Sequence, residues 1–177
     1  MRPLPTVRVN LSGRQFQGPR LADEVGDVVQ DVQLNPGSLV LEITETVLME
    51  NIQAAVITLQ QLKDLGVKLA VDDFGTGYSS LSYLKSFPID FLKIDRSFVE
   101  KLGEDPANKT IVAATIDLAH ALGMRVVTEG VETVAQLKQL MAIRCDIAQG
   151  NYFSKPLPGE IIPSLLSSAF ADKAPQR

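Results

Sequence analysis

Two adjacent carboxylates, Asp72 and Asp73, stand at the end of a short apolar run and are followed at once by a glycine-spaced loop. The preceding residues, 67–71, have the composition of a β-strand. Neighbouring side chains on a strand point to opposite faces, but at a strand's frayed end both carboxylates can turn toward one or two cations. Carboxylate oxygens suit Mg²⁺, Mn²⁺ or Ca²⁺ rather than Zn²⁺. A solvated Asp-Asp turn is the other interpretation, and the positions of the remaining polar residues distinguish the two.

Short β-rich runs alternate with longer helical patterns along the chain. We expect strands over residues 7–11, 39–44, 67–71, 91–94, 125–128 and 146–148. Between them, apolar residues recur at helical spacing, as in Ile52, Val56, Leu59 and Leu62, and again in Ile111, Ala114, Leu118 and Leu122. Strands that alternate with helices in this way form parallel βαβ units. No Pro-rich or Ser-rich linker divides the sequence, which indicates a single domain.

Polar residues follow the expected strands at their carboxyl ends. They are, in chain order, Asn10, Glu42, Asp72 with Asp73, Lys93 with Asp95, Glu129 and Gln149. In parallel α/β sheets and barrels the carboxyl ends of the strands meet at one edge, and that edge carries the active site. Solvation alone would also place polar residues at the amino ends. The sequence therefore predicts a functional site assembled from all six strand ends.

The composition limits the classes of function that the chain can have. With 177 residues, 45% of them hydrophobic and 21% charged, it resembles an ordinary soluble globular domain. The net charge of −4 argues against sequence-independent binding to duplex nucleic acid, which needs a basic face. Cys145 is the single cysteine, so we expect a packed thiol in a reducing compartment and no internal disulfide. No apolar run is long enough to span a membrane, and no signal peptide is evident.

Several motifs occur in one order along the chain. They are VNLS at residues 9–12, LEITE at 41–45, DDFGTGYSSL at 72–81, LKID at 92–95, TEGVE at 128–132, QG at 149–150 and FSKPLP at 153–158. From about residue 7 to residue 158, the chain thereby resembles the EAL-domain phosphodiesterases, bacterial enzymes that hydrolyse cyclic di-GMP to linear pGpG. The resemblance implies a TIM-like (β/α) barrel with about six βα units present. It also implies a role in cytoplasmic second-messenger signalling and biofilm regulation.

The resemblance further implies roles for single residues. Asn10, Glu42 and Asp72 would coordinate a first Mg²⁺ or Mn²⁺ ion, and Asp72 would bridge to a second ion held by Asp73. Two such cations, roughly 3.5–4 Å apart, stabilise both the attacking and the leaving oxygens of a phosphodiester. By the same resemblance, Lys93 would hold the attacking water and offset charge on the phosphate.

The remaining roles concern activation and support of the site. Glu129 would hold a metal ion or its water and help to activate the nucleophile, and Asp95 would orient Lys93. Gln149 would complete the polar ring, and Glu45 would anchor the loop after the Asp pair. Glu132 would support the site or, alternatively, cap the helix that follows it.

The chain departs from the family pattern at its amino-terminal side. The family's Glu-Ala-Leu motif, which precedes VNLS and supplies a metal ligand, occurs nowhere in the sequence. We therefore expect a single partial EAL domain over residues 1–177, ending in a helix at about 158–170. We also expect the exposed sheet edges to be covered by a second copy in a homodimer, or by a missing amino-terminal segment or domain. Three functions follow: a cyclic di-GMP phosphodiesterase, a cyclic di-GMP receptor or protein-interaction module, and an unrelated metal-dependent barrel enzyme.

Overall fold

The computed structural model describes residues 5–75, 81–103 and 105–171, and within these ranges six parallel strands form one sheet in the order of the sequence. The strands are β1 Val7–Asn10, β2 Leu39–Thr44, β3 Lys68–Phe74, β4 Phe91–Ile94, β5 Arg125–Thr128 and β6 Ile147–Ala148. The predicted bounds of β2, β4 and β5 are confirmed. The prediction for β3 was wrong at its end, because the strand continues beyond Val71 and includes both aspartates.

Helical segments connect each strand to the next, and two more follow β6 within the described ranges. They are α1 Gly13–Phe16, α2 Leu21–Asp31, η1 Pro36–Ser38, α3 Glu45–Glu50, α4 Ile52–Asp64, α5 Leu81–Leu84, α6 Arg96–Glu100, α7 Pro106–Ala121, α8 Val134–Ala142, η2 Gly159–Ile161 and α9 Ile162–Ala171. Side chains cap the amino ends of several: Asn51 caps α4, Asp105 caps α7, and Thr133 forms a capping box with Gln136 on α8. These caps satisfy backbone N–H groups that a helix leaves unpaired.

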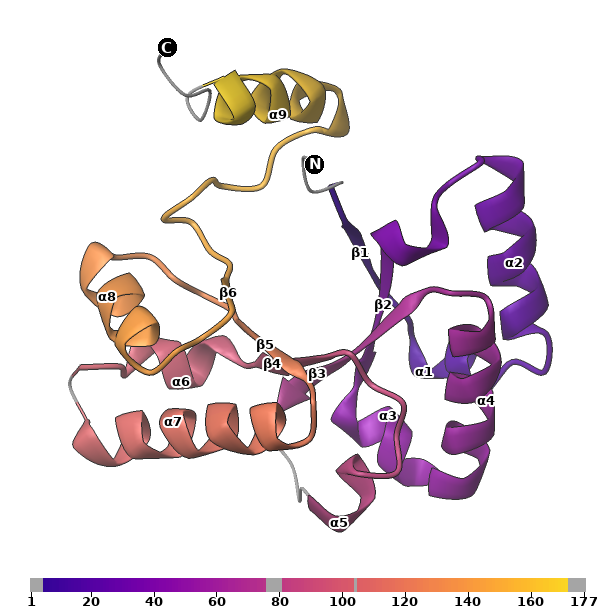
Figure 1. Ribbon diagram of the computed structural model, residues 1–177, viewed down its shortest axis with the longest axis horizontal. Helices are drawn as coiled ribbons and strands as arrows, with labels where there is room; N and C mark the ends of the chain where they lie inside the picture. The colour runs from indigo at the N-terminus through magenta and orange to yellow at the C-terminus, as the bar shows by residue number, and fades with distance from the viewer. Residues whose placement is uncertain (1–4, 76–80, 104, 172–177) are drawn as a thin grey trace.

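The sheet curls into a half-barrel with the helices on its outside (Figure 1). Parallel βαβ connections are right-handed. Because each strand lies beside the next one in the sequence, every such connection passes over the same face of the sheet. The other face then becomes the inside of the curl. The expectation of an incomplete TIM-like barrel is confirmed.

The two faces of the sheet have different cores. The outer face packs strand residues such as Leu41, Leu69 and Leu92 against buried helix residues such as Leu59 and Ile116. The inner face holds a smaller apolar group formed by Val40, Ala70, Phe91 and Val127, with Ile147 packed against it. Along each strand, alternate residues therefore serve the outer core and the inside of the half-barrel.

In α7 the buried face differs from the apolar set that the sequence emphasised. Ile111 is 51% exposed, whereas Val112, Ile116 and Ala119 are buried against the sheet. Two apolar sets, one residue apart in phase, run along this helix. Periodicity predicts the helix, but contact with β5 and its neighbours decides which set is buried.

Two aspartates repeat one arrangement at the amino ends of strands. Asp90 accepts a hydrogen bond of 2.8 Å from Lys63, in the last turn of α4, and another of 2.8 Å from a backbone N–H of β3. Asp146 likewise accepts a 2.8 Å hydrogen bond from a backbone N–H of β5 and lies 2.8 Å from His120, in the last turn of α7. Asp90 thus links the end of α4 to β3, and Asp146 links the end of α7 to β5.

We expect Asp146→Asn to lower the free energy of unfolding by about 1 kcal/mol at neutral pH. Burial alone would raise the pKa of Asp146, but hydrogen bonds from Val126 and His120 outweigh burial and lower it. A carboxyl whose pKa falls on folding stabilises the protein above its unfolded pKa, and this contribution disappears as the pH falls through the folded pKa. Urea unfolding should therefore show a deficit at neutral pH that fades as the pH falls below the unfolded pKa of about 3.9. Asp117→Asn, at an exposed ion pair with Arg144, is the control; an equal deficit at both pH values would contradict the prediction.

The carboxyl-terminal segment lies away from the half-barrel (Figure 1). The helix α9 begins at Ile162, four residues after the expected start of the last helix. Apolar side chains of this segment are exposed, among them Phe153, Ile161 and Ile162. None of the helices in the described ranges has the length and apolarity that a membrane crossing requires.

Candidate active site

The buried ammonium group of Lys93 lies among three carboxylates at the carboxyl edge of the half-barrel. Its Nζ atom is 2.5 Å from Glu42 Oε2, 2.9 Å from Asp72 Oδ1 and 2.8 Å from Glu129 Oε1. These residues come from β4, β2 and β3 and from the position after β5. Four of the predicted site residues therefore meet at one point, because the parallel strands end side by side.

The carboxylates keep Lys93 positively charged. Burial alone would lower the pKa of Lys93, but its hydrogen bonds to Glu129, Glu42 and Asp72 raise it above its ordinary value. Such a lysine remains an ammonium ion at neutral pH, so it can offset negative charge but cannot act as a general base. Three carboxylates around one ammonium leave a net charge of −2, which favours a further cation.

Arg8 joins this group, and the sequence analysis missed it. Its NH1 atom is 3.2 Å from Glu42 Oε1, and its guanidinium carbon lies 4.7 Å from the centre of the Phe91 ring. Arg8 precedes Asn10 by two residues on β1, so both occupy the same face of the strand. That alternation was a signal from which the position of Arg8 could have been predicted.

A bulge in β3 explains how two adjacent aspartates belong to one site. In the pairing of β3 with β4, Val71 is opposite Leu92 but Phe74 is opposite Ile94. Asp72 and Asp73 therefore share the space opposite Lys93 alone. Asp73 has a φ of 54°, which few non-glycine residues adopt, and its N–H donates to Asp72 Oδ1 at 2.9 Å. Bulges of this kind redirect side chains beside functional sites.

The carboxyl group of Asp73 lies in a negative environment. Its pKa is raised, first by burial and then by the neighbouring charges of Asp72 and Asp95, while Lys93 acts in the opposite direction. A bound cation would remove this penalty. The electrostatic environment therefore makes Asp73 a favourable ligand for a cation.

Glu45 is buried at the start of α3, beneath the beginning of the loop that follows β3. Its Oε2 accepts a 3.4 Å hydrogen bond from the Gly75 N–H. Its other carboxylate oxygen has no hydrogen-bond partner among the described residues. The expected contact with the loop is thus present at Gly75, while the part of the loop at residues 76–80 lies outside the described residues.

The other predicted residues are placed around the edge of the site. Asn10 is exposed beside Glu42, its partner in the register of β1 and β2. Gln149 is exposed, and its backbone N–H donates to Thr128 O at 2.8 Å.

Asp95 and Glu132 both lie at helix starts. Asp95 caps α6, where hydrogen bonds from Ser97 lower its pKa, and no ion pair joins it to Lys93 within the described ranges. Glu132 is exposed just before the capping box of α8, and its backbone N–H donates to Gln136. The capping of α8 is thus carried by Thr133 and Gln136 rather than by the Glu132 carboxylate.

The donor set suits a divalent metal in its chemistry. Carboxylate and amide oxygens are the ligands that Mg²⁺ and Mn²⁺ prefer, and the site carries surplus negative charge. In the part of the chain that the structure describes, however, no group of three acidic, His or Cys side chains is arranged to hold a metal ion directly. The carboxylates surround Lys93 instead, so a metal ion would share them with this ammonium group.

Comparisons with known proteins agree with this architecture. The EAL domain family model matches residues 2–156. The bifunctional diguanylate cyclase/cyclic di-GMP phosphodiesterase MucR of Pseudomonas aeruginosa is 42% identical over 154 residues, which are 87% of this chain and 22% of MucR. Overall, the chain spans about a fifth to a quarter of the length of the curated relatives it matches.

Two solved structures are similar to the half-barrel. The phosphodiesterase of P. aeruginosa MucR, in complex with c-di-GMP, superposes with a TM-score of 0.85 at 41% identity, covering 89% of this chain and 64% of that one. The manganese/cy-diGMP complex of Klebsiella pneumoniae BlrP1 superposes with a TM-score of 0.79 at 32% identity, covering 85% of this chain and 39% of that one.

Proposed function

The chain belongs to the EAL domain family, and from this premise we propose that it hydrolyses cyclic di-GMP to linear pGpG at a site with two divalent cations, Mg²⁺ or Mn²⁺. The observation that carries the proposal is the convergence of Glu42, Asp72 and Glu129 on Lys93. The cyclic di-GMP in the MucR structure and the manganese with cyclic di-GMP in BlrP1 support the choice of substrate and metal.

The residues of this chain would divide the work as follows. Asn10, Glu42, Asp72 and Asp73 would hold the cations, which when bound supply Lewis-acid stabilisation of the charge on the phosphodiester oxygens. Lys93, kept as an ammonium, places a fixed positive charge beside the same oxygens. Glu129 has the most exposed side chain of the three carboxylates around Lys93, at 27%, and would accept a proton from the attacking water.

A receptor that binds cyclic di-GMP without cleaving it is the second candidate. One observation favours it: the carboxylates of the site are already engaged by cations of the protein, Lys93 and Arg8. A metal ion would have to compete with these groups. A receptor would need only the charge and shape of the site, and would retain binding when the metal is removed.

Incubation of the purified chain with cyclic di-GMP and Mn²⁺ tests the proposal. Linear pGpG would be measured by chromatography, with Asp72→Asn as the test variant and the exposed Asp117→Asn as the matched control. Product from the parent and the control, but not from Asp72→Asn, supports two-metal hydrolysis. The receptor is supported if no product forms with Mn²⁺ while calorimetry in EDTA still detects binding of cyclic di-GMP. Neither product nor binding contradicts both candidates for this chain.

A further inference from the structure

Three basic side chains surround one buried aromatic ring inside the half-barrel. The guanidinium carbon of Arg8, the Nζ of Lys68 and the guanidinium carbon of Arg125 lie 4.7, 5.9 and 5.8 Å from the centre of the Phe91 ring. We call these four residues the cationic cage. The three charges come from β1, β3 and β5, and Phe91 comes from β4, between two of them. In a barrel, alternate strands contribute the side chains of one interior layer, and here such a layer is basic.

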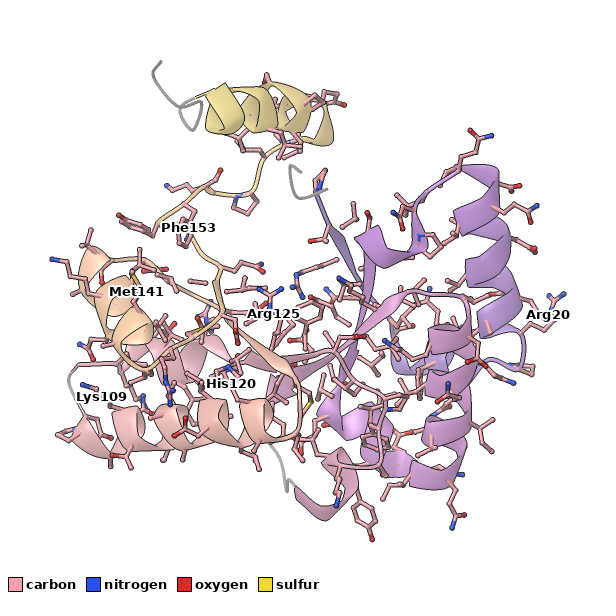
Figure 2. All side chains as sticks on the ribbon, viewed as in Figure 1. Arg20, Lys109, His120, Arg125, Met141 and Phe153 are labelled. Carbon is pink, nitrogen blue, oxygen red and sulfur yellow. The ribbon has the colours of Figure 1, made fainter. Side chains whose placement is uncertain are left out.

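The register of the sheet places the cage at the amino edge of the half-barrel. Lys68 and Arg125 are the first residues of their strands, and Arg125 is opposite Phe91. Lys93 follows Phe91 by two residues on the same face of β4, toward the carboxyl edge. The cage therefore lies on the inner side of the sheet, nearer to its amino edge than the carboxylate site, by which we mean Lys93 with Glu42, Asp72 and Glu129. Figure 2 labels Arg125 of the cage.

The positive charge of the cage is only partly balanced. Arg8 has an ion pair with Glu42. Across residues 5–75, 81–103 and 105–171, the side chains of Lys68 and Arg125 have no hydrogen-bond or ion-pair partner, although Arg125 lowers the pKa of Asp146 from beyond ion-pair distance. Because all three charges lie within 5.9 Å of one point, no two of them are more than about 12 Å apart. The ring face offsets part of this repulsion, because its negative quadrupole attracts each cation.

We propose that the cationic cage is a binding site for a small oxyanion, a phosphate group in particular. Arginine and lysine are the side chains that bind phosphate, arginine through paired N–H donors and lysine as a point charge. Contact with the Phe91 ring restricts the three cations, so less side-chain freedom is lost when an anion binds beside them. The concave inner face concentrates their field. Arg125 is exposed and Lys68 is half-buried, which leaves the charges open to a ligand.

Thermal unfolding with increasing inorganic phosphate tests this site, because a ligand that binds only the folded state raises the unfolding midpoint. The ionic strength is held constant with chloride. EDTA removes divalent cations, so that no metal ion holds phosphate at the carboxylates around Lys93. The test variants are Lys68→Gln and Arg125→Gln, and the matched control is Lys109→Gln, on the exposed side of α7. Arg8 is left unchanged because it also contacts Glu42.

We expect phosphate to raise the midpoint of the parent and of Lys109→Gln. The half-saturating concentration should be about tenfold higher in each test variant, since each loses one charge-assisted contact. Half-saturation at lower concentration with GMP than with phosphate would assign the site to nucleotides, and the reverse to free phosphate. The proposal is overturned if phosphate raises the unfolding midpoint of the parent no more than chloride does. It is also overturned if Arg125→Gln has the same half-saturating concentration as the parent. Arg125→Gln tests the site by itself if Lys68→Gln does not fold.

Discussion

Lys93→Met is expected to lower the free energy of unfolding by about 3–5 kcal/mol at neutral pH. Methionine has a similar length and is tolerated in a buried position, so the loss is mainly electrostatic. Without the ammonium, Glu42, which is 5% exposed, is left beside Asp72 and Glu129 with only Arg8 to balance three negative charges. Removing one partner of a buried ion pair has this large effect because the other charge stays buried.

The pH dependence distinguishes charge from packing as the cause. Folding raises the pKa of Lys93, so its contribution to stability is complete below the unfolded pKa of about 10.4 and is lost only as the pH rises through the folded value. In Lys93→Met this contribution is absent, so the deficit relative to the parent should be constant below about pH 10.4 and should shrink at higher pH. Urea unfolding at neutral pH and above about pH 10.4 measures this difference, beside Lys109→Met. A deficit that does not change with pH would mean that lost packing, and not lost charge, destabilises the variant.

Glu129→Gln is expected to lower kcat for cyclic di-GMP by about 10²–10⁴-fold, the range for loss of a general base. This prediction depends on the proposed hydrolysis. Glutamine keeps the size and one acceptor oxygen for Lys93 but cannot take a proton. The Glu129 side chain is 27% exposed, so the fold should survive the change far better than it survives Lys93→Met.

Rates of pGpG formation at saturating substrate, together with KM, measure the effect of Glu129→Gln. Glu24→Gln, at an exposed ion pair of α2, is the control and should behave like the parent. A kcat within tenfold of the parent would exclude Glu129 as the proton acceptor. A raised KM with unchanged kcat would instead assign Glu129 to substrate or metal binding.

The strands could be predicted because burial on both faces leaves a strong signal in the sequence. The β-rich runs that became β2, β4 and β5 were predicted with their observed bounds. The short helices α1, α3 and α6 were not predicted, since four to six residues are too few for a helical period to appear. In α7 the period was present but its phase was not, because two apolar sets compete and only the neighbouring strand selects between them.

The candidate site could be predicted as a set of residues but not as a geometry. Polar residues at strand ends indicated that Glu42, Asp72, Lys93 and Glu129 would meet. The structure places each of the three carboxylates within hydrogen-bond distance of Lys93. The bulge at Asp73 depends on the pairing between β3 and β4, which no local pattern contains. Alternation along β1 places Arg8 on the same face as Asn10, but its contact with the Phe91 ring depends on the curl of the sheet.

The order of the strands also determines how the chain can be made. Each described strand pairs with the strand that precedes it in the sequence, as in Val40 with Lys68 and Phe91 with Arg125. Every strand pair therefore forms between neighbouring βα units. Contacts between nearby parts of a chain form fast because little loop entropy is lost. A ribosome delivers the amino-terminal units first. The half-barrel is therefore suited to growth by one βα unit at a time during translation, and the carboxylate site becomes complete only when the fifth strand has docked.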